Sequence, residues 1–165
     1  MIAVKKVGPE SIPLIRELAK MTWAIAYAAI ISSEQMKYML ELFYSKDSLL
    51  QQMQNGHQFI IASEENRALG FASYSPKSAG EWSLYRLHKI YIDPGQQGKG
   101  IGKYLLDFIT KDIKPLAATG IELNVNRYNK ALGFYQKLGF VIIKEEDIDI
   151  GNGYFMNDYV LNKII

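Results

Sequence analysis

Apolar residues recur with two different spacings along this chain, and the spacing changes several times between its ends. In the first third they recur every three or four residues, which is typical of helices that bury one face. This pattern predicts a helix from Ile12 to about Ala28, a second after Ser32 or Ser33, and a third from Ser45 through Met53. A short strand, Ile2 to Val7, precedes them.

The rest of the chain alternates strand and helix patterns. Two strands form a predicted hairpin, and a longer strand runs into a glycine-rich loop and a helix that Pro115 stops. The predicted elements are strands Gln58–Ser63, Ala68–Ser75 and Trp82–Ile92, helix Gly100–Lys114, strand Gly120–Val125, helix Asn129–Leu138, and strands Val141–Ile148 and Tyr154–Asn162. This order, without repeats or linkers, predicts a mixed α/β fold in one domain over residues 1–165.

Composition restricts the function classes. The chain has 165 residues and no cysteine, so disulfides, thiolate metal sites and a covalent acyl-cysteine are excluded. A net charge of +2 gives no nucleic-acid footprint. With His57 and His88 as the two histidines we expect no metal site. There is neither a membrane-length apolar run nor a signal-peptide layout, so we expect a cytoplasmic protein.

The loop between Asp93 and Leu106 carries the clearest chemical signal. Clustered glycines let backbone N–H groups converge, and the helix behind them adds its positive dipole end, so an anion is expected there. A Walker loop requires Ser or Thr after Lys, whereas Lys103 is followed by Tyr104. A dinucleotide fingerprint requires a third glycine at the position of Lys103 and an early place in the chain. Both alternatives therefore fail.

Two segments identify the anion by resemblance. Gln97, Gly100 and Gly102 form a Gln-x-x-Gly-x-Gly motif, and the segment Asn124 to Phe140 follows after one helix and one strand. Together they resemble the GNAT family of N-acetyltransferases, over about residues 58 to 162. The C-terminal stretch from Asp149 to Leu161 is similar to a bacterial branch that includes PaiA-type polyamine acetyltransferases. The resemblance implies a mostly antiparallel sheet, splayed after its fourth strand and flanked by helices.

The resemblance also implies acetyl-CoA as co-substrate. The loop N–H groups would bind its pyrophosphate, and the backbone of the preceding strand would pair with its pantetheine arm. Lys99, Lys103 and Lys130 are candidate charges for the outer phosphate. The expected cofactor-binding residues are Ile90, Tyr91, Ile92, Gln97, Gly98, Lys99, Gly100, Ile101, Gly102, Lys103 and Asn129.

Asn129 lies six residues before Tyr135, one fewer than the family spacing of its cofactor-contacting asparagine. Asn129 therefore has two candidate roles, which are compatible. It contacts the cofactor through a shifted loop, a role that Asn126 would otherwise fill, or it caps the following helix.

Acetyl transfer poses two protonation problems. An alkyl amine has a pKa near 10.4 and must lose a proton, while the coenzyme A thiolate, with a thiol pKa of about 8.5, must gain one. By resemblance Tyr135 is the candidate acid, and the alternative is a core tyrosine with only a packing role. Asn124 stands where the family often has a glutamate, and an amide cannot accept a proton. The base therefore stays open among a water chain and the side chains Glu122, His88, Glu81, Asp149 and Asp158.

The sequence says less about the acceptor of the acetyl group than about its donor. We expect a primary amine on a small molecule, a polyamine or a peptide, acetylated directly in a ternary complex. The aromatic residues of the N-terminal helices are either core or an amine pocket: Trp23, Tyr27, Tyr38 and Tyr44. The carboxylates near the C-terminal strands either attract a polyamine or form a solvated face: Glu145, Glu146, Asp147, Asp149 and Asp158.

Two alternatives to an enzyme stay open, a non-catalytic acyl-CoA sensor and an α/β domain without a coenzyme A site. The apolar end Ile164-Ile165 and the edge strands leave a homodimer open as well.

Overall fold

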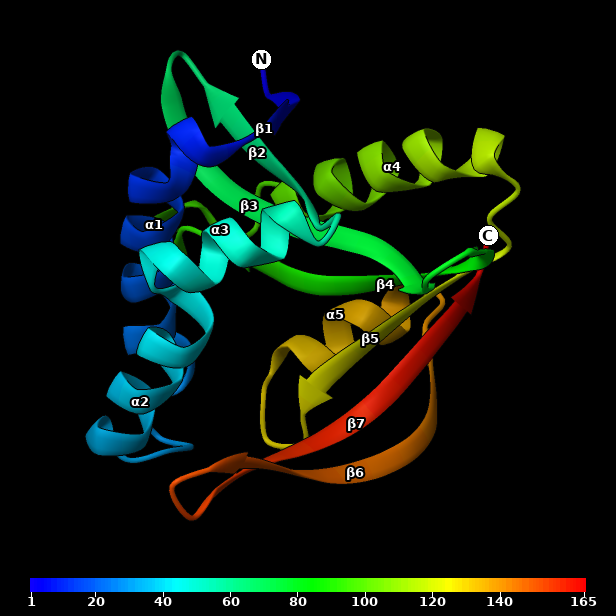
Figure 1. The fold of residues 1–165 in the computed structure, drawn as a ribbon. Coiled ribbons are helices and arrows are strands. Elements are labelled where there is room, and N and C mark those ends of the chain that lie inside the picture. The colour runs from blue at the N-terminus through cyan, green and yellow to red at the C-terminus, as the bar shows by residue number, and fades with distance from the viewer.

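Seven strands and five α-helices make up the protein (Figure 1). The computed structural model describes residues 1–165, apart from the side chain of Glu81. The strands are β1 (Ala3–Val7), β2 (Gln58–Glu64), β3 (Arg67–Ser78), β4 (Glu81–Ile92), β5 (Gly120–Asn126), β6 (Val141–Gly151) and β7 (Tyr154–Ile164). The helices are α1 (Ile12–Ala26), α2 (Ser33–Tyr44), α3 (Lys46–Gln54), α4 (Ile101–Ile113) and α5 (Ala131–Lys137).

The element order confirms the prediction from the sequence, with shifts at the ends. The largest shift at a helix start is in α5, which begins at Ala131, two residues later than predicted. The side chain of Asn129 explains it, because its Oδ1 accepts a hydrogen bond from the Ala131 N–H at 2.9 Å and so holds the chain outside the helix. None of the described helices is long and apolar enough to cross a membrane.

The sheet has the order β1-β2-β3-β4-β5-β7-β6, and its described neighbours are antiparallel except for β4 and β5. These two parallel strands pair over Leu84–Leu87 and Gly120–Leu123. Beyond those residues they separate, as the diverging ribbons in Figure 1 show. The last part of β4, from His88 to Ile92, therefore has an unpaired edge toward β5. This is the splay that the family resemblance implied.

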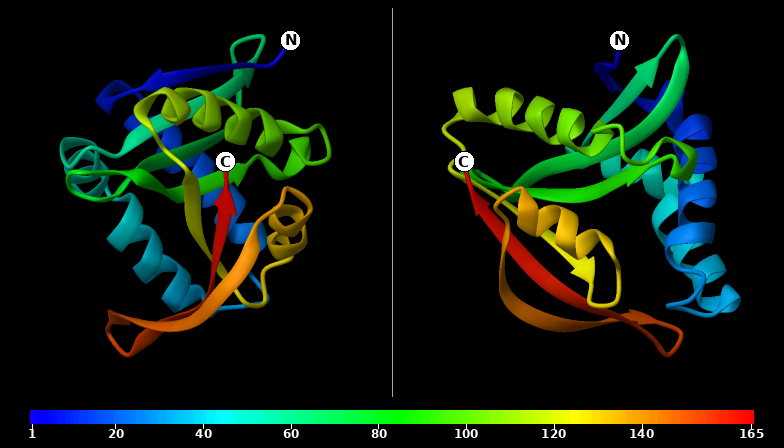
Figure 2. Two further views of the ribbon diagram at one scale, coloured as in Figure 1. Left: turned by 90° about the vertical axis from the view of Figure 1, so that its right-hand side faces the viewer. Right: turned by 180° about the vertical axis from the view of Figure 1, so that it is seen from behind.

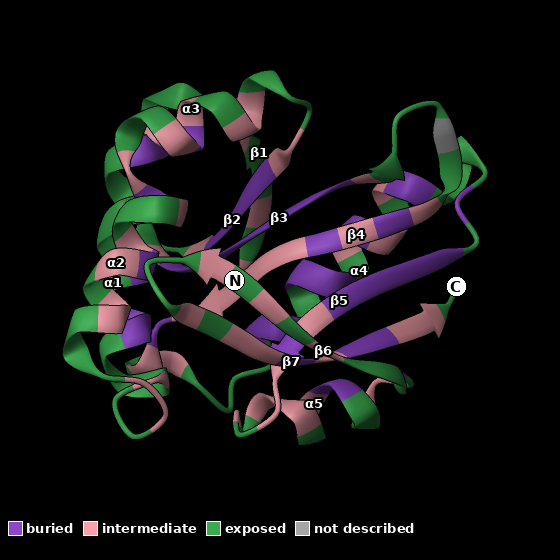
Figure 3. Cartoon of the chain, turned by 60° about the horizontal axis from the view of Figure 1, so that its bottom comes forward, coloured by how far each residue is buried: buried purple, intermediate pink, exposed green. Residues whose placement is uncertain are grey.

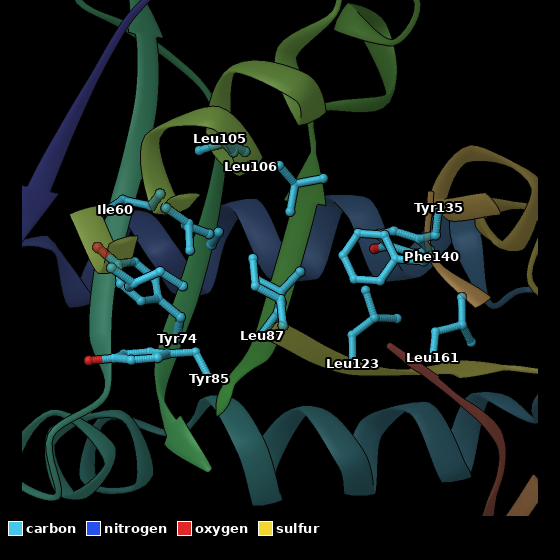
Figure 4. Close-up of a cluster of buried hydrophobic side chains, with 14 of the residues drawn as sticks. Ile60, Tyr74, Tyr85, Leu87, Leu105, Leu106, Leu123, Tyr135, Phe140 and Leu161 are labelled. Atoms are coloured by element: carbon cyan, nitrogen blue, oxygen red, sulfur yellow. The ribbon is translucent and has the colours of Figure 1, made fainter. Parts of the chain in front are cut away.

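Helices cover both faces of the sheet, with α1, α2 and α3 on one side and α4 and α5 on the other (Figure 2). The strands between them carry most of the buried positions (Figure 3). Figure 4 shows the core under α4 and α5, where Leu87 and Leu123 from the diverging strands lie beside Tyr135 and Phe140. The second core packs α1 and α3 onto Phe59 and Phe71.

A β-bulge in β4 decides which side chains face the splay. Ser73 of β3 is paired with Lys89, and the next residue, Tyr74, is paired with Leu87, so His88 is the extra residue. Such a bulge twists a strand and redirects its side chains. As a result Leu87 packs into the α4 core, while His88 and Lys89 both face the side of α1–α3.

Gly70 is required where β3 meets β4. A Cβ added there would lie 2.6 Å from the Tyr91 carbonyl oxygen and 3.2 Å from the Ile92 Cα. We expect Gly70→Ala to lower the free energy of unfolding by about 1–3 kcal/mol, because backbone cannot yield as a flexible side chain does. Urea unfolding followed by circular dichroism measures the change.

Gly133 in α5 is the matched control, since a Cβ there meets nothing within 4 Å. Gly133→Ala is expected to be neutral or to stabilise by up to about 1 kcal/mol. Equal effects of the two substitutions would contradict the close approach at Gly70.

Candidate functional site

The glycine loop is an open cradle of backbone donors at the start of α4. Gly98 and Gly100 have φ of 85° and 76°, a conformation that favours glycine. Gly100 is the N-cap of α4 and supplies no side-chain cap, so the first-turn N–H groups need an outside partner. A Cβ added at Gly98 or Gly100 would meet nothing within 4 Å. The loop therefore presents free donors to open space.

Gly102 has the opposite surroundings. A Cβ there would lie 2.7 Å from Phe134 Cζ and 3.1 Å from Ile92 Cδ1. The first turn of α4 is thus packed against the end of β4 and against α5. Ile101 beside it is 2% exposed in the core. These two residues position the helix terminus, and they offer a ligand their backbone alone.

The two lysines of the loop have neighbours of their own. Lys99 Nζ donates to Gln96 Oε1 at 2.6 Å, and Lys103 Nζ pairs with Asp107 Oδ2 at 2.9 Å on the exposed face of α4. Both stay near the cradle, where their charge adds to the helix dipole. The structure therefore brings the predicted segment Gln97–Lys103 to the end of β4, next to its free edge.

Tyr135 lies where β4 and β5 separate. It comes from α5, is 7% exposed and packs edge-on against Phe134 and Phe140. Burial, followed by the nearby Tyr27, raises the pKa of its hydroxyl well above the usual value of 10. The hydroxyl therefore keeps its proton throughout the neutral range.

On the other side of the splay is a cavity of about 360 Å³, enclosed by α1, α2, β4 and the β5–β7 strands. Three of the four predicted aromatics, Trp23, Tyr27 and Tyr44, line it. Tyr38 has another role, because its hydroxyl donates to the Ile150 carbonyl at 2.7 Å. Together with a hydrogen bond of 3.2 Å from Gln35 to the Phe155 carbonyl, it ties α2 to the β6–β7 hairpin.

A chain of polar side chains crosses the cavity floor. Arg86 donates to Glu122 Oε1 at 2.9 Å and to Asn124 Oδ1 at 2.6 Å. The Asn124 amide in turn donates to Asp158 Oδ2 at 3.2 Å. Arg86 thereby fixes the orientation of the Asn124 amide, which directs its N–H toward Asp158. Sequence reasoning missed Arg86, although its place between the apolar residues Tyr85 and Leu87 was a usable signal.

The candidate bases differ sharply in their surroundings. Glu122 is locked between Arg86 and Lys77 and is 4% exposed. Asp149 is exposed and accepts a hydrogen bond from the Gly151 N–H in a turn. The side chain of Glu81 lies outside the described part of the chain. Asp158 lines the cavity at 3% exposure, and burial, as the main cause, raises its pKa.

His88 is held neutral. Its ring stacks on His57 with centroids 3.9 Å apart, and its Nε2 lies 2.7 Å from Ser75 Oγ. Burial first, then the neighbouring His57, Lys89 and Arg86, lower its pKa to about 3. Such a ring is a weak base at neutral pH. Nor does any group of three or more potential metal ligands occur among the described residues.

A family model described as an acetyltransferase (GNAT) domain matches residues 27–156. Spermidine N(1)-acetyltransferase from Thermoplasma acidophilum is 30% identical over 161 residues, which cover 94% of this chain and 95% of that protein. Peptidyl-lysine N-acetyltransferase YjaB from Salmonella typhimurium is 37% identical over 67 residues, covering 39% of this chain and 43% of that protein.

Solved structures show the same architecture. The PaiA N-acetyltransferase from Thermoplasma acidophilum, in complex with coenzyme A, superposes with a TM-score of 0.83 at 27% identity, covering 100% of this chain and 99% of that one. A GCN5-related N-acetyltransferase from Rhodopseudomonas palustris gives a TM-score of 0.81 at 19% identity over 99% of this chain and 95% of that one, which shows a shared fold.

The neutral state of His88 has a consequence for stability. An unfolded histidine has a pKa near 6.5, so below pH 6.5 the unfolded chain takes up a proton that the folded chain refuses until about pH 3. Stability therefore falls as pH falls through this window. Between pH 7 and pH 5 we expect His88 to contribute a loss of about 2 kcal/mol.

Urea unfolding at several pH values tests this expectation. His88→Gln keeps a group that reaches Ser75 but removes the titration, so its stability is expected to vary less between pH 7 and pH 5. Identical pH profiles of the wild type and the variant would show that His88 is not the source.

Proposed function

This chain belongs to the GNAT family of acetyltransferases, and we propose that it transfers the acetyl group of acetyl-CoA directly to a primary amine in a ternary complex. The proposal rests on three features that lie together where β4 and β5 separate. They are the glycine loop without a side-chain cap, the free edge of β4, and the cavity whose carboxylate, Asp158, has no ion-pair partner among the described residues. We also propose that residues 1–165 act as a single acetyltransferase domain, since one sheet joins all seven strands.

Acetyl-CoA supplies the thioester and a pyrophosphate, and the chain has a matching partner for each part of it. The loop is open at Gly98 and Gly100, so the N–H groups from Gln97 to Gly102 suit the pyrophosphate. The backbone of Ile90–Ile92 fits the amides of the pantetheine arm, because that edge of β4 has no strand beside it. Both fits support direct binding of the co-substrate in front of Tyr135.

The acceptor amine approaches from the cavity. Asp158 is the carboxylate of the cavity wall, and it forms no ion pair with a described residue. We propose that Asp158 holds the ammonium and receives its proton, directly or through a water molecule. The amine nitrogen then attacks the thioester carbon, a C–N bond forms, and the C–S bond breaks with both electrons leaving on sulfur.

Tyr135 acts on the departing sulfur. Its hydroxyl is protonated at neutral pH because burial raises its pKa. Since that pKa lies above the thiol value of about 8.5, Tyr135 first stabilises the thiolate as a hydrogen-bond donor. The nitrogen loses two protons in all. The first passes to Asp158 before the attack and from there to solvent. The second leaves the nitrogen once the C–N bond has formed, and it balances the proton that the sulfur takes up as free coenzyme A. Asn124 positions Asp158 and is held in turn by Arg86.

A thiol-release assay with acetyl-CoA and a panel of primary amines tests the function. We expect turnover with intersecting lines in double-reciprocal plots, because no cysteine exists to carry the acetyl group. Parallel lines would contradict direct transfer. Thermal stabilisation by acetyl-CoA without turnover of any amine would favour the non-catalytic sensor instead.

Tyr135→Phe removes the proposed donor and leaves the ring in place. We expect kcat to fall about 100-fold with little change in the KM for acetyl-CoA, as for loss of a general acid. Tyr85→Phe is the control, since Tyr85 is 4% exposed in the same core but lies in the paired part of β4. An equal fall in both variants would assign Tyr135 a packing role.

A further inference from the structure

Lys89 places a positive charge in the cavity wall without a carboxylate beside it. The bulge at His88 turns Lys89 toward the cavity, where it is mostly buried. Its Nζ donates to the neutral Gln52 Oε1 at 2.8 Å and lies 5.1 Å from the Tyr44 ring centroid. It forms no ion pair with any described carboxylate. Burial lowers its pKa to about 8, so the side chain is still mainly protonated at pH 7.

The aromatic residues beside Lys89 leave its ammonium as the group that is able to meet an anion. Lys89 Nζ lies over the Tyr44 ring, and Tyr44 in turn packs edge-on against Trp23. The polar atoms of Trp23 and Tyr44 are buried, and the Tyr44 hydroxyl interacts with Trp23 and Tyr91. Lys89 is therefore the cation of this wall that has no anionic partner, which suits an anionic ligand group.

The acidic residues that might have attracted a polycation are occupied elsewhere. Arg127 pairs with Glu145 at 2.9 Å and also with Asp147, and Lys144 pairs with Glu146 at 2.8 Å. Asp158 is left as the negative group of the cavity wall. The cavity thus has a negative group on its β7 wall and a positive group on its β4 wall.

From this polarity we propose that the acceptor is an amino acid or related aminocarboxylate, whose amine faces Asp158 and whose carboxylate binds Lys89. This inference rests on the proposed function and specifies its substrate class. The carboxylate accepts a hydrogen bond from Lys89, and it takes no part in the transfer. A polyamine of similar length would instead bring a second ammonium against Lys89, which like charges disfavour.

Three acceptors that share one amine-terminated alkyl chain separate these cases: 5-aminopentanoate, pentylamine and cadaverine. They carry a carboxylate, a methyl group and a second amine at the far end. L-Leucine and 3-methylbutylamine form a second pair with the amine next to the carboxylate. We expect at least one aminocarboxylate to exceed its partner without a carboxylate about tenfold or more in kcat/KM, the size of a charged hydrogen bond. A preference for cadaverine or for both amines that lack a carboxylate would overturn the proposal.

Lys89→Met keeps the volume of the side chain and removes its charge. It is expected to lower kcat/KM for the preferred aminocarboxylate about tenfold and to change that of the matching amine without a carboxylate less than about threefold. Lys111→Met on the exposed face of α4 serves as the control. Equal losses with both acceptors would overturn the role of Lys89.

If the protein is not an acetyltransferase, a binding measurement still tests the role of Lys89. If no acceptor is acetylated, calorimetric titration of 5-aminopentanoate and pentylamine into the protein with coenzyme A still measures the cavity. Binding of the aminocarboxylate alone, lost in Lys89→Met, would support this inference while contradicting the transferase. Equal binding of both ligands, or of neither, would overturn the inference.

Discussion

The pairing of β4 with β5 stops at Leu87 and Leu123, and the rest of the site depends on this limit. A parallel pair that continued would satisfy the backbone of both strands and close the sheet. Because the strands separate, the backbone groups of His88 to Ile92 keep one free edge. A sheet normally protects such an edge. Here it lies between two helical layers, where a ligand with amide groups is able to complete it.

Because β4 and β5 separate, the two hydrophobic cores on opposite faces of the sheet both border the gap between these strands. Tyr135 belongs to the core under α4 and α5, whereas Tyr27 and Tyr91 belong to the core under α1. Burial raises the pKa of all three hydroxyls, and electrostatic interaction couples Tyr135 to each of the others. The gap between the strands therefore joins the proposed cofactor side to the proposed acceptor side, and neither core has to be broken to connect them.

The fold and the backbone conformation of the glycine loop were largely predictable from sequence because their signals are local. The glycine spacing from Gln97 to Gly102 reports a backbone conformation, and the residues themselves impose it. The polar floor was not predictable in this way. Arg86, Asn124 and Asp158 come from three strands, and only the register of β4, β5 and β7 brings them together.

The β-bulge at His88 is a second feature that the sequence does not reveal. A strict alternation along β4 would place His88 and Lys89 on opposite faces. One extra residue puts both toward the cavity, and no residue type in that segment announces it. Asn129 shows the reverse case, since its capping role was visible in the sequence and shifted the helix start by two residues.

The two hydrogen bonds that tie α2 to the β6–β7 hairpin affect which hairpin residues are able to change. Tyr38 and Gln35 both bind main-chain carbonyls, of Ile150 and Phe155. A carbonyl is present whatever side chain it carries, so the hairpin is able to exchange most of its side chains and remain attached to α2. Gly151 is the exception, because a Cβ there would lie 2.7 Å from the Tyr38 hydroxyl. The side of the cavity that we propose for the acceptor is therefore able to change its side chains without loss of this attachment, and the glycine loop at the start of α4 is untouched by such changes.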